Sequence, residues 1–333
     1  MMLSSSKLSK PRRAAAVALA SVLGLSALAA CSSGQASEAA ESGLTPLKII
    51  VAPVHFEPAY IADRMGFFED HGLDVSVQPG ADAQANFAQA LSGDVDIVTT
   101  SWTVMATSNA EGVPVTAIAS NGYISAESKG SGVLVRPDSG ITSVADLAGK
   151  TIGVQGVRSG SDLAVLLAAE DAGTDPDSLV QVALPFPAMQ AALESGQVDA
   201  VMAVDPFFSQ IAGAGMENLG NMQAQFTPDV PSTVWATTDN WLAENEESAE
   251  KFAAAMEDAV AYYEDPANLE EVRAITAEIS QTDIDKVTKV LPTISVAFKR
   301  QAASDNLSAL SRLGYLTKEV TFEDMVWDRA PMN

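Results

Sequence analysis

The sequence predicts an α/β protein with two lobes and a ligand cleft between them. From residue 47 to residue 204, short β-branched runs alternate with helical patterns, as is typical of parallel sheets flanked by helices. Polar segments near 120–135 and 226–233 interrupt this pattern and could carry the chain between lobes. A phrase also recurs, as SGDVDIVTTSW at 92–102 and SGQVDAVMAVDPF at 195–207, which indicates one similar unit in each lobe. One continuous sheet with surface decoration is the alternative.

The first 44 residues have the character of a targeting signal and a tether. Basic residues within 7–13 precede an apolar stretch, 14–30, that ends in Leu-Ala-Ala-Cys and is too short and too rich in small residues for a membrane span. This ending resembles the lipobox of bacterial lipoproteins, so we expect a signal peptide over 1–31 and lipidation of Cys31, the one cysteine in the chain. The polar and acidic segment 32–44 is expected to be flexible. The export route, Sec or twin-arginine, stays open.

The alternation predicts each later element in turn. We expect strands at 47–52, 73–77, 95–99, 115–119, 133–136, 151–155, 179–184 and 198–204. We expect helices at 59–68, 84–91, 102–111, 143–148, 161–172 and 187–195. The C-terminal pattern is helical with charged outer faces, at 240–263, 269–279, 284–291 and 302–313. The first lobe is therefore assigned to 45–125 with 234–333, and the second lobe to 126–233.

Composition excludes several classes of function. The net charge is −24 and becomes −28 without residues 1–31, so no basic cluster is available for nucleic acid. The chain has two histidines and one cysteine, and no group of His, Asp and Glu has metal-ligand spacing. Gly149-Lys150-Thr151 mimics the end of a phosphate-binding loop, but Val144 stands where a glycine is needed and a strand pattern follows. We therefore expect no enzyme activity, no cofactor and no metal site.

Candidate ligand-binding residues are taken from the predicted strand ends, because ligands of open α/β sheets bind beyond the carboxyl ends of the strands. Three of them follow the first strand: His55, Phe56 and Glu57. Glu57 could instead cap the next helix through the helix dipole. Phe56 is expected to form a wall of the pocket.

A second group of candidates joins a strand to a helix start in the predicted second lobe. It comprises Arg158, Ser159 and Ser161, whose hydroxyl and backbone N–H groups suit an anion at a helix N-terminus. Arg158 is the one basic residue in the candidate cleft loops. It could pair with a carboxylate or sulfonate, or it could be a solvated surface arginine.

The remaining candidates are mostly flat side chains, which suit a site that encloses an apolar or ring-bearing ligand. They are Ser101, Trp102, Tyr123, Asp205, Phe207 and Trp235. Trp235 could line a hinge or pack in the core. Because Trp102 and Asp205 each lie nine residues after the glycine of the repeated phrase, we expect them to face each other across the cleft.

Four stretches carry a resemblance to a known family. They are PAYIADRMGFFEDHGLDVSV at 58–77, QALSGDVDIV at 89–98, VLVRPDSGITSVADLAGKTIGV at 133–154 and ALPFPAMQAALESGQVDAVMAVDPF at 183–207. In this order the chain resembles the substrate-binding proteins of nitrate, sulfonate and taurine ABC importers, the group that includes NMT1/THI5-like proteins. The resemblance implies a two-lobed periplasmic-binding-protein fold of type II with two crossovers. It also implies a monomeric, lipid-anchored protein on the extracytoplasmic face of the cell membrane, which delivers a small solute to a separate permease and ATPase.

The nature of the solute stays open at this point. Arg158 with its Ser/Gly turn favours an organic anion such as a sulfonate, as does the resemblance, whereas Glu57 and Asp205 among aromatic residues favour a pyrimidine or another amine-bearing ring, such as a thiamine precursor. A solute sensor for a signalling receptor would use the same fold. The Cys-rich motif of the self-sacrificing pyrimidine synthases is absent, since no cysteine follows Cys31.

Overall fold

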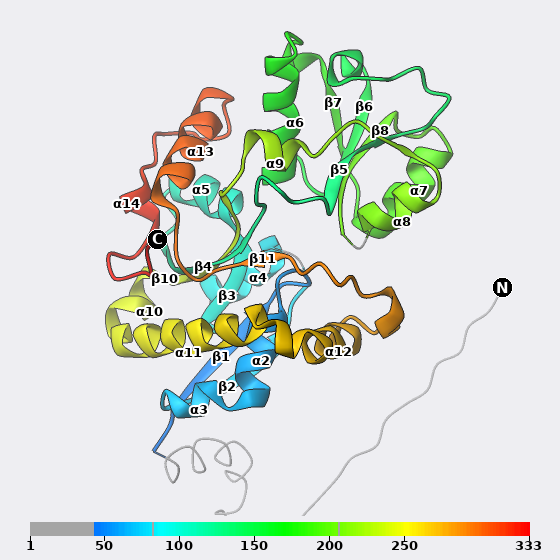
Figure 1. The fold of residues 1–333 in the computed structure, drawn as a ribbon. Helices are drawn as coiled ribbons and strands as arrows, with labels where there is room; N and C mark the ends of the chain where they lie inside the picture. Colours follow the sequence, from blue (N-terminus) through cyan, green and yellow to red (C-terminus); the bar gives the residue numbers. More distant parts are fainter. Residues whose placement is uncertain (1–42, 82, 206) are drawn as a thin grey trace, which may run out of the picture. The chain divides into compact units, whose positions relative to one another are not determined.

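The structure is a computed structural model that describes residues 43–81, 83–205 and 207–333 (Figure 1). The predicted signal peptide, Cys31 and most of the predicted tether lie outside these residues. Within the described part, no helix is both long and apolar enough to cross a membrane. The described chain contains two β-sheets, so the predicted α/β fold with two sheets is confirmed and the single continuous sheet is wrong.

The first sheet has six strands in the order β11-β4-β10-β3-β1-β2. Strand β1 lies between β2 and β3 and is parallel to both, whereas β10 is antiparallel to β3 and β4. The strands span Thr45–Val51 (β1), Leu73–Pro79 (β2), Ile97–Ser101 (β3), Val115–Tyr123 (β4), Pro231–Thr238 (β10) and Thr293–Ile294 (β11). The carboxyl ends of β1 and β3 and the amino end of β10 therefore meet at one edge of this sheet.

The second sheet has five strands in the order β7-β6-β8-β5-β9. Strand β6 is parallel to β7 and β8, and β5 is antiparallel to β8 and β9. The strands span Ser131–Val135 (β5), Thr151–Val154 (β6), Val180–Ala183 (β7), Ala200–Val204 (β8) and Glu217–Asn218 (β9). Each sheet is thus mixed rather than purely parallel, because β5 and β10, the first strand after each crossing, are antiparallel to their neighbours.

The chain passes from the first sheet to the second after β4 and returns before β10. The two passing segments touch where the backbone N–H of Asp229 donates to the carbonyl of Ile124 at 3.1 Å. The lobe boundaries given above, 125/126 and 233/234, stay predictions. Strand β10 begins at Pro231, inside the predicted return segment. It pairs with β4 from Pro231 to Thr238 and with β3 from Thr233 to Ala236.

Helices cover both sheets, and Figure 1 shows α11 lying along the first one. The longer helices span Glu57–Met65 (α2), Ala83–Ser92 (α4), Trp102–Ala110 (α5), Gly160–Asp171 (α6), Phe186–Glu194 (α7), Glu246–Glu264 (α11), Leu269–Ile279 (α12) and Arg300–Arg312 (α13). The shorter helices span Phe67–Asp70 (α3), Phe207–Gly213 (α8), Met222–Phe226 (α9), Asp239–Glu244 (α10) and Phe322–Met325 (α14). Two predicted helices are reduced to single 3₁₀ turns: 143–148 becomes Val144–Leu147, and 284–291 becomes Ile284–Lys286.

The cores follow the two-residue period of the strands. In the second sheet, Val133 and Val135 pack on the side of α6, whereas Leu134 packs on the side of α7 and α8. The core of the first sheet also takes in Leu163 from α6. Helix α6 therefore contributes to both cores and links the two sheets through buried apolar surface.

The recurring phrase has one structural role in both sheets. The carboxylate of Asp96 accepts a hydrogen bond from Lys48 N at 2.8 Å, and that of Asp199 accepts one from Thr151 N at 2.9 Å. In each case the aspartate backbone N–H returns a bond to the carbonyl of the same partner residue. The Val-Asp pair thus fixes the start of β3 on β1 and of β8 on β6.

Candidate functional site

The carboxyl end of β1 leads into a turn that places His55 against β4 and β10. His55 has a positive φ of 53°, a conformation that few non-glycine residues adopt. Its Nδ1 lies 3.1 Å from Oγ1 of Thr233, at the start of β10. In the strand register, Thr233 lies opposite Ser101 of β3. Three strand ends and the β1 turn therefore meet around the Thr233 hydroxyl.

Asn121 and Gly122 complete this group from the end of β4. The Asn121 amide nitrogen donates to the carbonyl of His55 at 3.0 Å and to Thr233 Oγ1 at 3.3 Å. The backbone N–H of Gly122 also donates to Thr233 Oγ1, at 3.1 Å. A Cβ on Gly122 would lie 2.1 Å from His55 Nδ1, so the imidazole occupies the space that any side chain at 122 would fill. We call His55, Asn121, Gly122 and Thr233 the strand-end network.

Burial controls the charge of two groups near this network. It lowers the pKa of His55 to about 4, so the imidazole is neutral at pH 7. Burial also raises the pKa of Glu57, whose Oε1 accepts from Thr276 Oγ1 at 3.2 Å while Oε2 has no partner among the described residues. Glu57 is also the first residue of α2, where a carboxylate faces the positive end of the helix dipole. These contacts favour the helix-capping interpretation of Glu57 over ligand contact.

Two further predicted residues lie beside the network. Ser101 Oγ accepts from Val104 N at 3.1 Å and caps α5, so its hydroxyl hydrogen is not used by that contact. Phe56 is buried and packs edge-to-face on Tyr60, with ring centroids 6.1 Å apart. Ligand contact by either residue stays a prediction.

The predicted anion-binding group lies at the N-terminus of α6. Ser159 caps this helix by accepting from Asp162 N at 3.3 Å, and its Oγ lies 3.1 Å from that of Ser161. A Cβ on Gly160 would come within 3.4 Å of Thr103 Oγ1, so the first turns of α5 and α6 approach each other closely. The structure thus brings Ser101 and Ser159 to two adjoining helix starts, one following a strand of each sheet.

Arg158 does not point a free guanidinium at this helix start. Its Nη2 donates to the carbonyl of Gly314 at 2.8 Å and to the carbonyl of Tyr315, and its guanidinium lies 5.2 Å from the Tyr315 ring centroid. The Tyr315 hydroxyl in turn donates to Asp162 Oδ2 at 2.7 Å. Burial raises the pKa of Asp162 to about 6, and its Oδ1 has no partner in the described chain. Arg158, Asp162 and Tyr315 therefore bond α6 to the segment after α13.

Three of the aromatic candidates are packed in the core of the first sheet. Trp102 is 1 % exposed and lies between Phe298 and Phe322, at centroid distances of 6.2 and 6.3 Å. Trp235 is fully buried against Phe252, which agrees with the core alternative for this residue. Tyr123 is 2 % exposed and donates to the carbonyl of Ala297 at 2.6 Å. In this structure the three rings offer almost no surface to a ligand.

The expectation that Trp102 and Asp205 face each other across a cleft is wrong in this structure. The Trp102 ring is enclosed by the C-terminal segments, as described above. Asp205 bonds locally instead, because its Oδ1 accepts from Ser209 N at 3.0 Å and from Ser209 Oγ at 2.6 Å, at the start of α8. Phe207 stacks on Phe186, with centroids 5.5 Å apart. The equal spacing of Trp102 and Asp205 from a glycine indicates that their strands belong to similar units, but it does not predict where the two side chains point.

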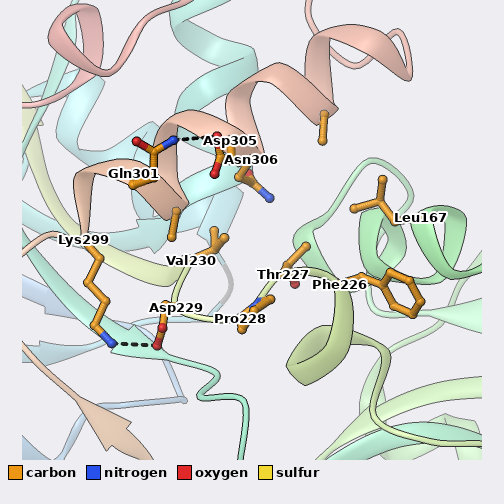
Figure 2. Close-up of a pocket in the computed structure, with 12 residues that line it drawn as sticks. Leu167, Phe226, Thr227, Pro228, Asp229, Val230, Lys299, Gln301, Asp305 and Asn306 are labelled. Atoms are coloured by element: carbon orange, nitrogen blue, oxygen red, sulfur yellow. Dashed lines mark hydrogen bonds and ion pairs between the residues drawn. The ribbon is translucent and has the colours of Figure 1, made fainter. Parts of the chain in front are cut away.

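A cavity of about 490 Å³ lies elsewhere, along the return segment and α13 (Figure 2). It is lined by Leu167, Phe226, Thr227, Pro228, Asp229, Val230, Lys299, Gln301, Ala302, Asp305, Asn306 and Ala309. Lys299 Nζ forms an ion pair with Asp229 Oδ1 at 2.7 Å at one end of it. Neither the predicted site residues nor the residues of the strand-end network line this cavity, although Lys299 Nζ lies 5.7 Å from the Tyr123 ring centroid.

The sequence interpretation missed Asn121, Gly122, Thr233 and Asp162. Asn121-Gly122 follows the predicted strand 115–119 after one residue, Ser120, so the strand-end rule could have included it. Thr233 and Asp162 gave no comparable signal, because they act through contacts with residues more than a hundred positions away. Among residues 43–81, 83–205 and 207–333, no group of three or more His, Cys, Asp or Glu side chains is arranged to hold a metal ion.

Comparisons with known proteins agree with this architecture. A family model described as "NMT1/THI5 like" matches residues 53–268. YtlA of Bacillus subtilis strain 168, whose own assignment as a binding protein is provisional, is 25 % identical over 281 residues, which cover 83 % of this chain and 80 % of YtlA.

Solved structures similar to this one are periplasmic binding proteins. The aliphatic sulphonate binding protein SsuA of Escherichia coli superposes with a TM-score of 0.71 at 18 % identity, over 86 % of this chain and 98 % of SsuA. The nitrate-binding protein NrtA of Synechocystis PCC 6803 gives 0.65 at 15 % identity, over 84 % of each chain. At these identities the superpositions establish the two-lobed fold alone.

Proposed function

Because the chain belongs to the NMT1/THI5-like family, we propose that it is the extracytoplasmic solute-binding protein of an ABC importer and is anchored through a lipid on Cys31. The carrying observation is the strand-end network, a set of polar groups at the edge of the first sheet where open α/β sheets bind ligands. Thr233 of this network lies opposite Ser101 at the start of α5, and α5 in turn approaches the start of α6, which follows a strand of the second sheet. A solute held there would touch both lobes and favour their closure.

The proposed solute is a small organic anion of the sulfonate type. The polar groups near the strand-end network and the start of α6 include hydrogen-bond donors for an anion. They are the hydroxyls of Ser101, Ser159 and Ser161 and the N-terminus of α6. The names of SsuA and NrtA, a sulphonate and a nitrate binder, point to the same class of solute. Of the predicted residues, this proposal assigns ligand contact to His55, Ser101, Ser159 and Ser161.

A pyrimidine or another amine-bearing ring is the second candidate. It is favoured by unpartnered buried acceptors, since Glu57 Oε2, Asn121 Oδ1 and Asp162 Oδ1 have no hydrogen-bond donor in the described chain. A ring N–H donor could satisfy such an atom. The stability that each class of solute adds to the folded chain decides between the two candidates.

A thermal-shift screen of the purified full chain tests the proposal. Alkanesulfonates, taurine and nitrate form one set, and aminopyrimidines and aromatic amines form the other. A solute that binds the folded chain at 100 times its Kd adds about 2.7 kcal/mol of stability and raises the Tm. No increase with any compound of either set would overturn the solute-binding role.

The lipid anchor has a separate test. Full-length chain expressed in a bacterial host should incorporate labelled fatty acid and sediment with membranes. Cys31→Ala should abolish both, whereas Ser32→Ala is the matched control and should change neither. Labelled product from Cys31→Ala, or unlabelled wild type, would contradict the anchor.

The absence of enzyme activity is proposed on the same basis. The compared structures, SsuA and NrtA, are binding proteins by name, and the candidate site contains one histidine and no thiol among the described residues. Any solute found in the screen should be recovered unchanged after prolonged incubation. Its conversion to another compound would contradict this part of the proposal.

A further inference from the structure

The Thr233 hydroxyl fixes the protonation of its neighbours. A hydroxyl has one hydrogen to donate and two lone pairs that accept. Both lone pairs of Thr233 Oγ1 are engaged, by the N–H of Gly122 at 3.1 Å and by the amide nitrogen of Asn121 at 3.3 Å. Its own hydrogen is therefore left for the third neighbour, His55 Nδ1, at 3.1 Å.

The donor role of Asn121 is itself determined by its surroundings. The same amide nitrogen lies 3.0 Å from the carbonyl oxygen of His55, which can only accept. With the amide turned over, the side-chain oxygen of Asn121 would face that carbonyl oxygen, and two acceptors would lie together with no hydrogen between them. Gly122 donates from its backbone and has no alternative role. The direction of every hydrogen bond at Thr233 is thus settled.

It follows that His55 Nδ1 accepts and carries no proton. A neutral imidazole holds one N–H, which must then be on Nε2. A cationic imidazole would need a second N–H on Nδ1, pointing at an oxygen whose lone pairs are already taken. Burial acts in the same direction, since it lowers the pKa of His55 to about 4.

The Nε2 atom of His55 is neither fully buried nor hydrogen-bonded within the described chain. None of the described residues accepts a hydrogen bond from Nε2, and the residue keeps part of its accessible surface. The opposite side of the ring is fixed by Thr233, and Gly122 leaves the space that it fills. The direction of the Nε2–H bond is therefore fixed by the protein before a ligand binds.

We propose that His55 is a neutral, Nε2-protonated donor that fixes an acceptor atom of the solute, and that the site holds its anion by neutral dipoles rather than by a countercharge. This inference rests on the proposed solute-binding function. The remaining donors would come from the hydroxyls of Ser101, Ser159 and Ser161 and from the start of α6. The guanidinium of Arg158 is already bonded to two backbone carbonyls. The chemical class that fits is a sulfonate or a comparable oxyanion that stays ionised over the whole pH range of the measurement.

Two substitutions at His55 separate a binding role from a structural one. His55→Gln can place an N–H₂ donor near the position of Nε2, whereas His55→Asn reaches only the position of Nδ1. Asn is the residue better suited to the positive φ of 53°. We expect the Asn variant to fold at least as stably as the Gln variant but to bind the best sulfonate at least about tenfold more weakly than the Gln variant does. Affinities that follow stability instead of donor position would overturn the proposal.

The pH dependence of binding gives the second test. A neutral donor predicts that the ratio of the alkanesulfonate Kd of His55→Gln to that of wild type changes less than about twofold between pH 5.5 and pH 8, because Asp162, whose pKa is about 6, titrates in both proteins and its effect cancels in the ratio. A cationic histidine predicts about a tenfold loss of affinity for each pH unit above its pKa. Such a loss in wild type that His55→Gln abolishes would overturn the proposal.

Imidazole ¹⁵N spectra of the ligand-free full chain test the tautomer without any solute. The chain has two histidines, so His71→Gln assigns the His55 signals. At pH 6.5 we expect wild type to have one protonated nitrogen, Nε2, and one unprotonated nitrogen, Nδ1. In Thr233→Val the hydroxyl that donates to Nδ1 is lost, so the proton is free to move to Nδ1. A cationic or Nδ1-protonated His55 in wild type would overturn the tautomer. Failure of every solute to bind, with the tautomer as expected, would instead count against the proposed function.

Discussion

Tyr315 donates its hydroxyl hydrogen to Asp162 across 2.7 Å and so bonds the segment after α13 to the first turn of α6. The carboxylate also accepts from the backbone N–H of Arg158 at 2.5 Å, which leaves Oδ1 alone without a partner among the described groups. Since α6 also contributes Leu163 to the core of the first sheet, the bond lies where the two halves of the described chain share buried surface.

Tyr315→Phe should destabilise the chain by about 1–3 kcal/mol at pH 7, because it leaves a buried carboxylate oxygen with one donor fewer. Urea unfolding measures the change. The matched control is Tyr262→Phe, which removes the same atom from an exposed bond to Glu271 and should change the free energy of unfolding by less than about 0.5 kcal/mol. Equal effects of the two substitutions would show that burial of Asp162 does not matter.

Acid should change stability through His55 and Asp162 in opposite directions. The folded pKa of His55, about 4, is below its ordinary value, so the unfolded chain takes up the proton first and the stability that the neutral ring contributes is lost as pH falls from about 6.5 to 4. The folded pKa of Asp162, about 6, is above its ordinary value, so the folded chain takes up that proton first and stability is gained as pH falls from about 6 to 4. Each contribution is at most about 3 kcal/mol.

Substitution of each group in turn exposes the contribution of the other. Relative to wild type, His55→Asn should gain stability as pH falls from 7 to 4.5, and Asp162→Asn should lose it. Urea unfolding at the two pH values gives these differences, in which the other carboxylates cancel. The same sign for both variants would contradict the assigned protonation states.

Gly122→Ala should disrupt the strand-end network without straining the backbone, because φ at this glycine is not positive. The added methyl group would occupy the place of the His55 ring, 2.1 Å from Nδ1, so the ring must leave Thr233. We expect a loss of about 1–3 kcal/mol in stability and at least about a tenfold loss of solute affinity. Gly213→Ala, where a Cβ meets nothing within 4 Å, is the control and should bind normally. Wild-type affinity in Gly122→Ala would place the solute elsewhere.

The sequence predicts the parts of this fold that depend on local pattern. The alternation of strands and helices places most elements of both sheets, and the repeated Val-Asp pair marks equivalent strand starts because Asp96 and Asp199 make the same backbone bonds. Burial of Trp102 could not be foreseen, since it depends on Phe298 and Phe322 about two hundred residues away. A strand-end rule finds positions near a site. It does not say which side chains turn toward the sheet core and which turn toward a ligand.

Arg158 offers the sharpest test between the sequence interpretation and the structure. If the guanidinium pairs with an anionic solute, Arg158→Lys should keep much of the affinity, because an ammonium group preserves the charge. If its role is to hold the carbonyls of Gly314 and Tyr315, Lys should behave like Ala, because a lysine has no planar guanidinium to lie over the Tyr315 ring and direct a nitrogen at both carbonyls. The two cases therefore differ in whether Arg158→Lys and Arg158→Ala have different affinities for the solute.

We expect the second case, in which Arg158→Lys and Arg158→Ala each lose about 1–2 kcal/mol of stability while the Kd for a sulfonate changes less than about threefold in both. Arg312→Ala is the control, since it removes an exposed ion pair between α13 and Glu170 of α6 and should cost less than about 1 kcal/mol. Calorimetric titration below the Tm of every variant separates affinity from stability. The opposite outcome is that Arg158→Ala loses affinity, Arg158→Lys keeps it, and neither changes in stability. That outcome would return Arg158 to the anion site, because a lysine replaces the charge that attracts an anion but not the hydrogen bonds that the guanidinium makes.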